Sequence, residues 1–169
     1  MPVKKIKHRI IGMSPMIQFP CGFFNGAADK NKGGAGFVLH FSSSHNIHFS
    51  MGCDRCTNTK AEMMALWGLL TVSKMMGIPL HSIHGDSLVI ISWAIGKNSL
   101  NLPHLSHWGD DIRDLLQNFP ELIVKHIYRE HNQIADILSK NALLLDSGYG
   151  NYKEILNEFS TDHGNFQLF

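Results

Sequence analysis

The chain has 169 residues, of which 44% are hydrophobic and 17% charged, and its formal net charge is +1. This length fits one domain with a substantial core, and the composition excludes an intrinsically disordered chain. Charged residues, histidine or glycine interrupt every apolar run, so we expect no membrane-spanning helix. A net charge this small excludes a polyanion binder that depends on bulk charge, so a nucleic-acid partner requires a local basic surface.

Residues 1–16 are basic and show no sustained hydrophobic periodicity, which predicts a flexible basic linker. They lack the apolar core and the small-residue cleavage site of a signal peptide. The chain has three cysteines, and this odd number disfavours a disulfide framework. We therefore expect an intracellular protein, nuclear or cytoplasmic and not secreted, that acts as a monomer.

Three strands are predicted in the first part of the domain, which we place at residues 17–147. They cover residues 18–25, 36–41 and 45–51, where turn residues separate the apolar runs. Because the connections between them are short, we expect an antiparallel meander.

Helices and two further strands follow in alternation. A capping-box pattern, Thr59-Lys60-Ala61-Glu62, begins a helix that ends before Gly77. The remaining predicted elements are a strand at 81–85, helices at 88–95 and 104–119, a strand at 122–129 and a helix from Asn132 to Leu145. Residues 148–169 are predicted to be a C-terminal tail with one short helix around 152–159. The order βββαβααβα indicates an α/β protein with a mixed sheet flanked by helices.

Three acidic residues fall at strand ends or in first helical turns: Glu62, Asp86 and Asp136. Each also has a structural explanation, because Glu62 fits a capping box, Asp86 fits a helix N-cap and Asp136 complements a helix dipole. In an open α/β sheet, however, functional groups gather where strands end and helices begin. Convergent carboxylates repel one another unless a cation neutralises them, and oxygen ligands without histidine or cysteine favour Mg²⁺ or Mn²⁺.

Five short strings fall at predicted strand ends, turns and helix starts, in order from about Phe23 to Leu145. They are Phe24-Asn25-Gly26-Ala27-Ala28, Gly34-Ala35-Gly36, Thr57-Asn58-Thr59-Lys60-Ala61-Glu62, Gly85-Asp86-Ser87-Leu88-Val89-Ile90 and Tyr128-Arg129-Glu130-His131-Asn132-Gln133-Ile134-Ala135-Asp136. Together they resemble the ribonuclease H family, and most closely its plant branch associated with the reverse transcriptases of retroelements. Residues 164–169 also resemble the end of such retroelement proteins.

This resemblance implies a ribonuclease H-like five-stranded mixed sheet in the order 3-2-1-4-5, flanked by α-helices, and cleavage of the RNA strand of RNA–DNA hybrids. It implies that Glu62, Asp86 and Asp136 fill three of the family's four metal-binding, catalytic positions, where two Mg²⁺ ions (or Mn²⁺ in their place) bracket the scissile phosphate. The residues that match nucleic-acid-binding positions are Asn31, Asn58, Thr59, Ser87 and Asn132. His131 matches a catalytic position that assists proton transfer or product release, although an exposed loop histidine without a role explains it equally well.

Asn25 occupies the remaining metal-binding and catalytic position, where the family has aspartate. A neutral amide offers one oxygen and a donor group that repels a cation. A loss of about 3–4 kcal/mol of metal-dependent stabilisation would slow turnover by about 10²–10³-fold. Three hypotheses remain open: an impaired endonuclease, a catalytically inactive nucleic-acid-binding module, and a protein-interaction domain that kept the fold. Asn25 is equally compatible with natural drift and with a deliberate substitution that traps substrate.

One segment has a zinc-like spacing formed by His45, His48, Cys53 and Cys56. Because two histidines three residues apart on a strand face opposite sides, we do not expect zinc. The chain also has eleven histidines, and several on one face would make that face more cationic below about pH 6.5.

Glycine, methionine and tryptophan patterns are assigned to turns and packing. A glycine cluster without the ending of a P-loop predicts a tight turn: Gly33, Gly34 and Gly36. Residues assigned to the core are Met63, Met64, Met75, Met76, Trp93 and Trp108. Lys97 is the only basic side chain between the two tryptophans, so we expect modest and salt-sensitive affinity for a hybrid.

Overall fold

A seven-stranded sheet forms the centre of the molecule in this computed structural model, which describes residues 17–99 and 105–169. The strands are β1 (Cys21–Ala28), β2 (Gly33–Ser42), β3 (His45–Cys53), β4 (Ser82–Gly85), β5 (Ile123–His126), β6 (Tyr149–Leu156) and β7 (Phe159–Gln167). The α-helices are α2 (Asn58–Met75), α3 (Leu88–Ala94), α4 (Ser106–Leu116) and α5 (Gln133–Asn141). The predicted linker at 1–16 and part of the predicted loop at 96–103 lie outside the described residues.

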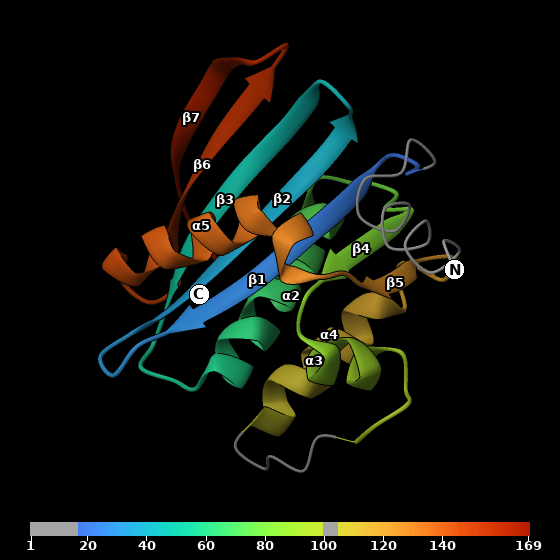
Figure 1. Cartoon of the computed structure of the whole chain (residues 1–169), viewed down its shortest axis with the longest axis vertical. Helices are drawn as coiled ribbons and strands as arrows, with labels where there is room; N and C mark the ends of the chain where they lie inside the picture. Colours follow the sequence, from blue (N-terminus) through green and yellow to red (C-terminus); the bar gives the residue numbers. More distant parts are fainter. Residues whose placement is uncertain (1–16, 100–104) are drawn as a thin grey trace, which may run out of the picture.

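The strand order is β5-β4-β1-β2-β3-β6-β7 (Figure 1). β1, β2 and β3 pair antiparallel, which confirms the predicted meander. β4 pairs parallel with β1, and β5 pairs parallel with β4. The order 3-2-1-4-5 of the first five strands and the mixed character of the sheet are therefore confirmed.

Helices cover both faces of the sheet. Figure 1 shows α5 crossing in front of β1, β2 and β3, with α2 on the far side of these strands. Most of the buried side chains of α2 pack against the sheet and α4, with Leu66, Leu69 and Phe37 fully enclosed. Met63 and Met64 also lie in this core as predicted, whereas Met75 and Met76, at the C-terminal end of α2, are exposed and lie outside it. Trp93 is buried and Trp108 partly buried, as expected for core packing.

The C-terminal segment corrects the prediction of a five-stranded sheet followed by a tail with a short helix. Residues 149–167 form an antiparallel hairpin, β6 and β7, and β6 pairs antiparallel with β3. This pairing satisfies the otherwise open backbone groups of the β3 edge. The hairpin turns at Asn157 and Glu158, which both have positive φ, as a tight two-residue hairpin turn requires.

The start of α2 corrects the predicted capping box. Thr57 is the N-cap, and its hydroxyl accepts the N–H of Lys60 at 3.2 Å. Thr59 therefore lies inside the helix, and Glu62 is displaced from the position at which a glutamate would cap it. Among the described residues, no helix is both long enough and apolar enough to span a membrane.

Candidate functional site

A cleft of about 410 Å³ opens where β1 and β4 end and α2, α3 and α5 begin or pass. Its polar lining combines all four predicted carboxylate positions with two basic side chains. The lining residues are Asn25, Gly26, Ala27, Ala28, Asn58, Thr59, Glu62, Asp86, Ser87, Arg129, Asp136 and Lys140. The predicted convergence of the acids at one edge of the sheet is therefore present.

Asn25 lies on β1 and is 5% exposed. Its Nδ2 donates a hydrogen bond to Oδ1 of Asp136 at 3.0 Å, and its Oδ1 accepts the backbone N–H of Gly26 at 3.0 Å. Partners on both sides fix the orientation of the amide. The side chain therefore presents an N–H, not an oxygen, to the neighbouring carboxylate.

Glu62 lies in α2 and is 8% exposed. Its Oε1 accepts the N–H of Gly26 at 2.9 Å, while its buried Oε2 has no hydrogen-bond partner. Burial raises the pKa of Glu62 to about 8, and the backbone donor only partly opposes this rise. Gly26 makes the close contact possible, because a Cβ at this position would lie 2.2 Å from the backbone of Ala61.

Asp86 follows β4 directly and is held by two neighbouring elements. Nδ2 of Asn132 lies 3.3 Å from Oδ2 of Asp86, and the ring Nε2 of His126 lies 3.2 Å from the backbone oxygen of Asp86. The N-cap of α3 is Ser87, whose hydroxyl accepts the N–H of Ile90. The structural explanation of Asp86 as an N-cap is therefore wrong, and its carboxylate remains at the cleft.

Asp136 lies in the first turn of α5, as predicted. Its Oδ1 accepts from Asn25 and its Oδ2 accepts from Nζ of Lys140 at 3.0 Å. α5 reaches the sheet because Gly36 has no side chain, since a Cβ there would lie 2.4 Å from the oxygen of Ala135. The predicted tight turn at the glycine cluster is corrected accordingly: these glycines lie in β2 and allow a helix to pack on it.

The structure brings Asn58, Thr59 and Ser87 to the cleft, beside the acids. It places two other predicted residues elsewhere. Asn31 lies in the turn between β1 and β2, where its N–H bonds Asp29. His131 lies in the short 3₁₀ helix Arg129–His131 and lines a separate cavity.

Asn132 is only 2% exposed, so its side chain supports the site from behind. Its Nδ2 donates to the backbone oxygen of Phe24 at 2.9 Å and approaches Oδ2 of Asp86. No side-chain cap from Asn132 to α5 is formed. We therefore assign Asn132 to positioning Asp86, because a residue this buried does not reach a nucleic acid.

Two basic residues of the cleft were missed from the sequence: Arg129 and Lys140. Lys140 lies four residues after Asp136 on the same helix, and this spacing is typical of an ion pair. Arg129 lies within a string that resembles the family, and it is the first residue of the short 3₁₀ helix. The spacing of Lys140 was a signal that could have been used.

The donor set does not fit the two Mg²⁺ ions that the resemblance implies. Within residues 17–99 and 105–169, no three His, Cys, Asp or Glu side chains lie close enough together to hold a metal ion. Both carboxylate oxygens of Asp136 are bonded to protein donors, and Asn25 directs an N–H at that carboxylate. The carboxylate of Asp136 is therefore neutralised by the hydrogen bond from Asn25 and the ion pair with Lys140.

The zinc-like spacing also lacks a common site in the part of the chain that is described. The ring of His45 bonds Glu154, whereas His48 lies opposite Lys153 on the other side of β3. Burial raises the pKa of Cys53 to about 12, which disfavours the thiolate that zinc requires.

Sequence comparisons connect the chain with known proteins. The profile of a family described as reverse transcriptase-like matches residues 23–142. The uncharacterized protein YpeP of Bacillus subtilis is 30% identical over 129 residues, which cover 72% of this chain and 57% of that protein. Ribonuclease HI of Halobacterium salinarum is 30% identical over 124 residues, which cover 72% of this chain and 62% of that protein. The chain thus spans less than two thirds of the length of these curated relatives.

Solved structures share the fold. RNase H1 from Halobacterium salinarum has a TM-score of 0.68 at 28% identity, over 73% of this chain and 96% of that chain. LC11-RNase H1, isolated from compost and solved in complex with an RNA/DNA hybrid, has a TM-score of 0.66 at 25% identity, over 73% of this chain and 95% of that chain. The chain therefore belongs to the reverse transcriptase-like family and has the ribonuclease H-like fold.

Proposed function

We propose that this chain is a ribonuclease H-type domain that binds RNA–DNA hybrids and in which Asn25 strongly impairs cleavage of the RNA strand. Family membership and the likeness to a hybrid-bound RNase H1 support hybrid binding. The single observation that carries the impairment is the 3.0 Å hydrogen bond from Nδ2 of Asn25 to Oδ1 of Asp136.

The physical reason lies in the charge at position 25. An aspartate there would set two carboxylates side by side, an arrangement that is costly unless a cation lies between them. Asn25 instead donates an N–H to Asp136, so the pair is stable without a cation. The change removes one anionic ligand and directs a donor at another. A deficit of about 3–4 kcal/mol in the transition state corresponds to a rate about 10²–10³-fold lower.

The uncharged polar side chains of the cleft suit recognition of a nucleic-acid backbone. Asn58 and Thr59 begin α2, and Ser87 caps α3, so all three lie on the rim next to the acids. Hydroxyl and amide groups of this kind can bond both phosphate oxygens and a ribose 2′-hydroxyl. Contacts to the 2′-hydroxyl would distinguish the RNA strand from DNA.

A cleavage assay tests the proposal. The parent chain and its Asn25→Asp variant are incubated with an end-labelled RNA–DNA hybrid in Mg²⁺ buffer, and product is resolved on a gel. We expect cleavage by Asn25→Asp at least about 10²-fold faster than by the parent. The matched control is Asn25→Asp combined with Glu62→Gln, which keeps the number of acidic side chains of the parent and removes a different acid. We expect this double variant to remain inactive.

Two outcomes would contradict the impairment by Asn25. Equal cleavage by the parent and by Asn25→Asp would mean that the amide at position 25 is not the cause of the low activity. Hybrid binding without cleavage in either chain would favour the second candidate, a non-catalytic binding module, which the poor fit of the donor set to two cations supports. Deamidation of Asn25 would produce aspartate and could add activity to the parent. Intact-mass spectrometry of the parent is the control for this conversion.

The finer assignments rest on the sequence resemblance and remain proposals. They are the plant retroelement branch, the use of two Mg²⁺ ions by a chain that has aspartate at position 25, a monomeric state, and a nuclear or cytoplasmic location. The role of His131 in proton transfer or product release is also a proposal, and its position outside the cleft does not favour it.

A further inference from the structure

We infer that the cleft carries its own counter-cation, Lys140, and binds the phosphate backbone of a nucleic acid without a divalent metal ion. The inference rests on the proposed hybrid binding and deepens it by naming the group that meets the phosphate. It concerns binding alone and requires no cleavage step.

The position of Lys140 supports this role. Its Nζ lies 3.0 Å from Oδ2 of Asp136, and the two side chains are 64% and 26% exposed. An ammonium group has three N–H donors, so one contact with Asp136 leaves others for a ligand in the cleft. Lys140 therefore stands at the open side of the cleft with a donor group facing its acids.

The charges that line the cleft are more balanced than four carboxylates would be. With Asn25 neutral, three carboxyl groups remain, from Glu62, Asp86 and Asp136, and they are opposed by Lys140 and Arg129. Two features thus reduce the repulsion of an incoming phosphate: the amide at position 25 and the two cationic side chains. A four-carboxylate cleft would depend on bound cations for the same effect.

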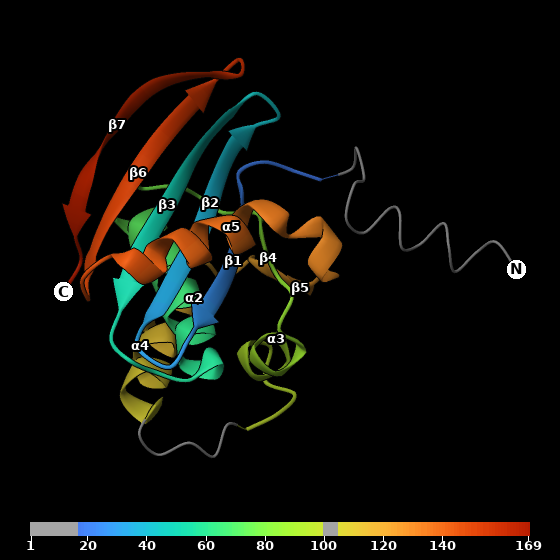
Figure 2. The same ribbon diagram turned by 60° about the vertical axis from the view of Figure 1, so that its left-hand side comes forward.

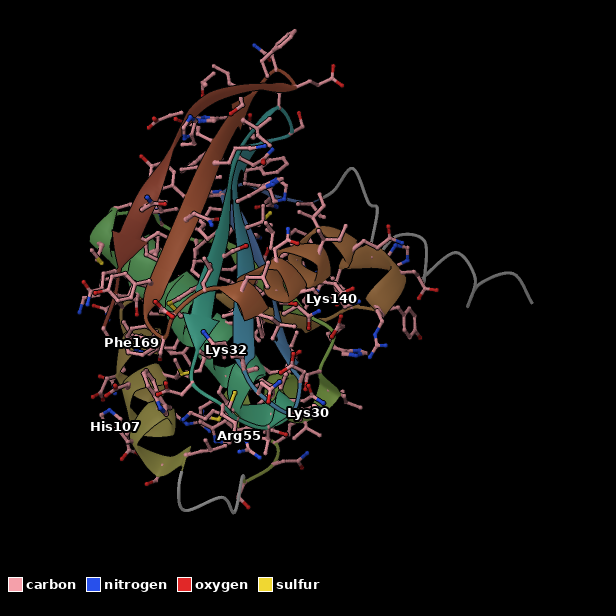
Figure 3. The ribbon with its side chains drawn as sticks, turned by 90° about the vertical axis from the view of Figure 1, so that its left-hand side faces the viewer. Lys30, Lys32, Arg55, His107, Lys140 and Phe169 are labelled. Atoms are coloured by element: carbon pink, nitrogen blue, oxygen red, sulfur yellow. The ribbon has the colours of Figure 1, made fainter. Side chains whose placement is uncertain are left out.

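Further basic side chains continue from the cleft along one side of the molecule. Figure 3 shows Lys140 on this side together with Lys30 and Arg55, which come from the β1–β2 turn and from the connection between β3 and α2. The β1–β2 turn begins directly after Ala28, and the β3–α2 connection ends directly before Asn58. Both Ala28 and Asn58 line the cleft. The exposed acids Asp29 and Asp54 lie beside these two cations, so a backbone that leaves the cleft in this direction meets charges of both signs.

The ion pair itself leaves Lys140 available. An exposed lysine–carboxylate pair contributes about 0–1 kcal/mol to stability, because water screens both groups. A second N–H of the ammonium can therefore bond a phosphate oxygen at little cost, and a phosphate is a strong partner for it. Lys140 would then contact both groups, as a bound cation would.

Fluorescence anisotropy with a labelled RNA–DNA hybrid tests the inference on the full chain, in EDTA and in MgCl₂. We expect the parent to bind the hybrid in both buffers, with dissociation constants within about fivefold, which corresponds to about 1 kcal/mol. Lys140→Ala should weaken binding in EDTA about tenfold and reduce the slope of log K against log salt by about one. Lys74→Ala is the matched control, because Lys74 is exposed in the last turn of α2, at the end opposite the cleft.

A second readout measures the cleft without nucleic acid. Calorimetric titration with MgCl₂ should show tighter Mg²⁺ binding to Lys140→Ala and to Asn25→Asp than to the parent, since each change removes a group that competes for Asp136. Parent binding that is lost in EDTA and restored by Mg²⁺ would overturn the inference while hybrid binding stands. Absence of binding in both buffers would overturn it together with hybrid binding itself. Equal losses in Lys140→Ala and Lys74→Ala would overturn the assignment to Lys140.

Discussion

Two groups of side chains lie next to each other along β1, and they differ in whether their titratable members are charged. One is the cleft around Asn25, and the other is the histidine cluster, formed by Phe23, His40 and His84. Phe23 and Asn25 are two residues apart on β1, so their side chains point to the same side. In the cleft, a carboxylate is paired with donors from Asn25 and Lys140, whereas in the histidine cluster burial lowers the pKa of both rings and favours their neutral form.

Aromatic packing accounts for the histidine cluster. The ring of Phe23 stacks on His84 at 4.6 Å between centroids and meets His40 edge-on at 5.4 Å. Burial lowers the pKa of His40 and of His84 to about 4 in each case. The expectation that histidines gathered on one face become cationic below about pH 6.5 is therefore corrected for these two.

The comparison shows that residue type does not decide whether a polar side chain serves recognition. α5 lies over β1 and β2, as Figure 2 shows from a second direction, and its first residues border both groups. On the cleft side, charged groups remain accessible and compensate one another. In the histidine cluster, packing against Phe23 disfavours the charged form of His40 and His84. Each prediction below alters one of the two groups or displaces α5, which borders both.

The largest effect of a single substitution should come from displacing α5. Gly36→Ala places a Cβ 2.4 Å from both the oxygen of Ala135 and the nitrogen of Ser139, so the helix must shift. We expect a loss of about 3 kcal/mol in the free energy of unfolding, measured by urea denaturation. Gly109→Ala in α4 is the matched control, because the nearest atoms to its Cβ would be side-chain atoms of Trp93 at 3.3 Å and Met63 at 3.7 Å. A loss below about 1 kcal/mol for Gly36→Ala would contradict the close approach of α5.

Acidification should break the neutrality of the histidine cluster. The folded pKa values of His40 and His84, about 4, lie below the ordinary value of 6.5, so the unfolded chain takes up protons first as the pH falls. Stability is therefore full above about pH 6.5 and is lost progressively toward pH 4, by about 2–3 kcal/mol for each of the two histidines.

Urea denaturation across pH 4–7 measures this dependence. His84→Gln should flatten the fall in stability, whatever its effect at pH 7, because it removes one of the two protonations. His163→Gln on the exposed strand β7 controls for the loss of a histidine as such. A parent whose stability is constant between pH 6.5 and 4 would rule out buried neutral histidines in this cluster.

Much of the sheet and the cleft could be predicted from the sequence, since the signals were local. The strings around Glu62 and Asp86 predicted where α2 begins and β4 ends, whereas β1 continues to Ala28, beyond its predicted end at residue 25. The order of the first five strands came from the family resemblance. The structural explanations for Glu62 and Asp86 failed because Thr57 and Ser87 cap their helices. Thr57 and Thr59 are both suitable caps for α2, and Asp86 and Ser87 are both suitable caps for α3. Residue type alone does not decide which one caps the helix.

Other features depended on tertiary contacts that no local pattern encodes. The β6–β7 hairpin turns at Asn157 and Glu158, and glutamate is not a residue that signals a turn with positive φ. Asn132 fits a helix cap in sequence, but its amide bonds Phe24 and Asp86 across the fold. The histidine cluster likewise required the pairing of β1 with β2 and β4 to bring His40 and His84 together around Phe23.

A smaller effect is expected at Glu62, the buried acid of the cleft. Its folded pKa of about 8 lies above the ordinary value of 4.5, so the carboxylate opposes folding as the pH rises from about 4.5 through 8. Glu62→Gln should therefore stabilise the chain at pH 8 by about 1–2 kcal/mol and have less effect at pH 5. Thermal unfolding at both pH values measures the difference, with Glu121→Gln as an exposed control. Equal effects at pH 5 and pH 8 would contradict the shifted pKa.

The smallest effect on stability should come from replacing Lys140. This small effect would distinguish the exposed charges of the cleft from the buried histidine cluster. The ion pair with Asp136 is exposed, so Lys140→Ala should change the free energy of unfolding by less than about 0.5 kcal/mol in urea denaturation. The same variant should weaken hybrid binding in EDTA about tenfold, which corresponds to about 1.4 kcal/mol. Lys140→Arg should retain both properties, because it preserves the charge. A stability loss as large as the binding loss would mean that Lys140 supports the fold, as His84 does, and does not serve the ligand.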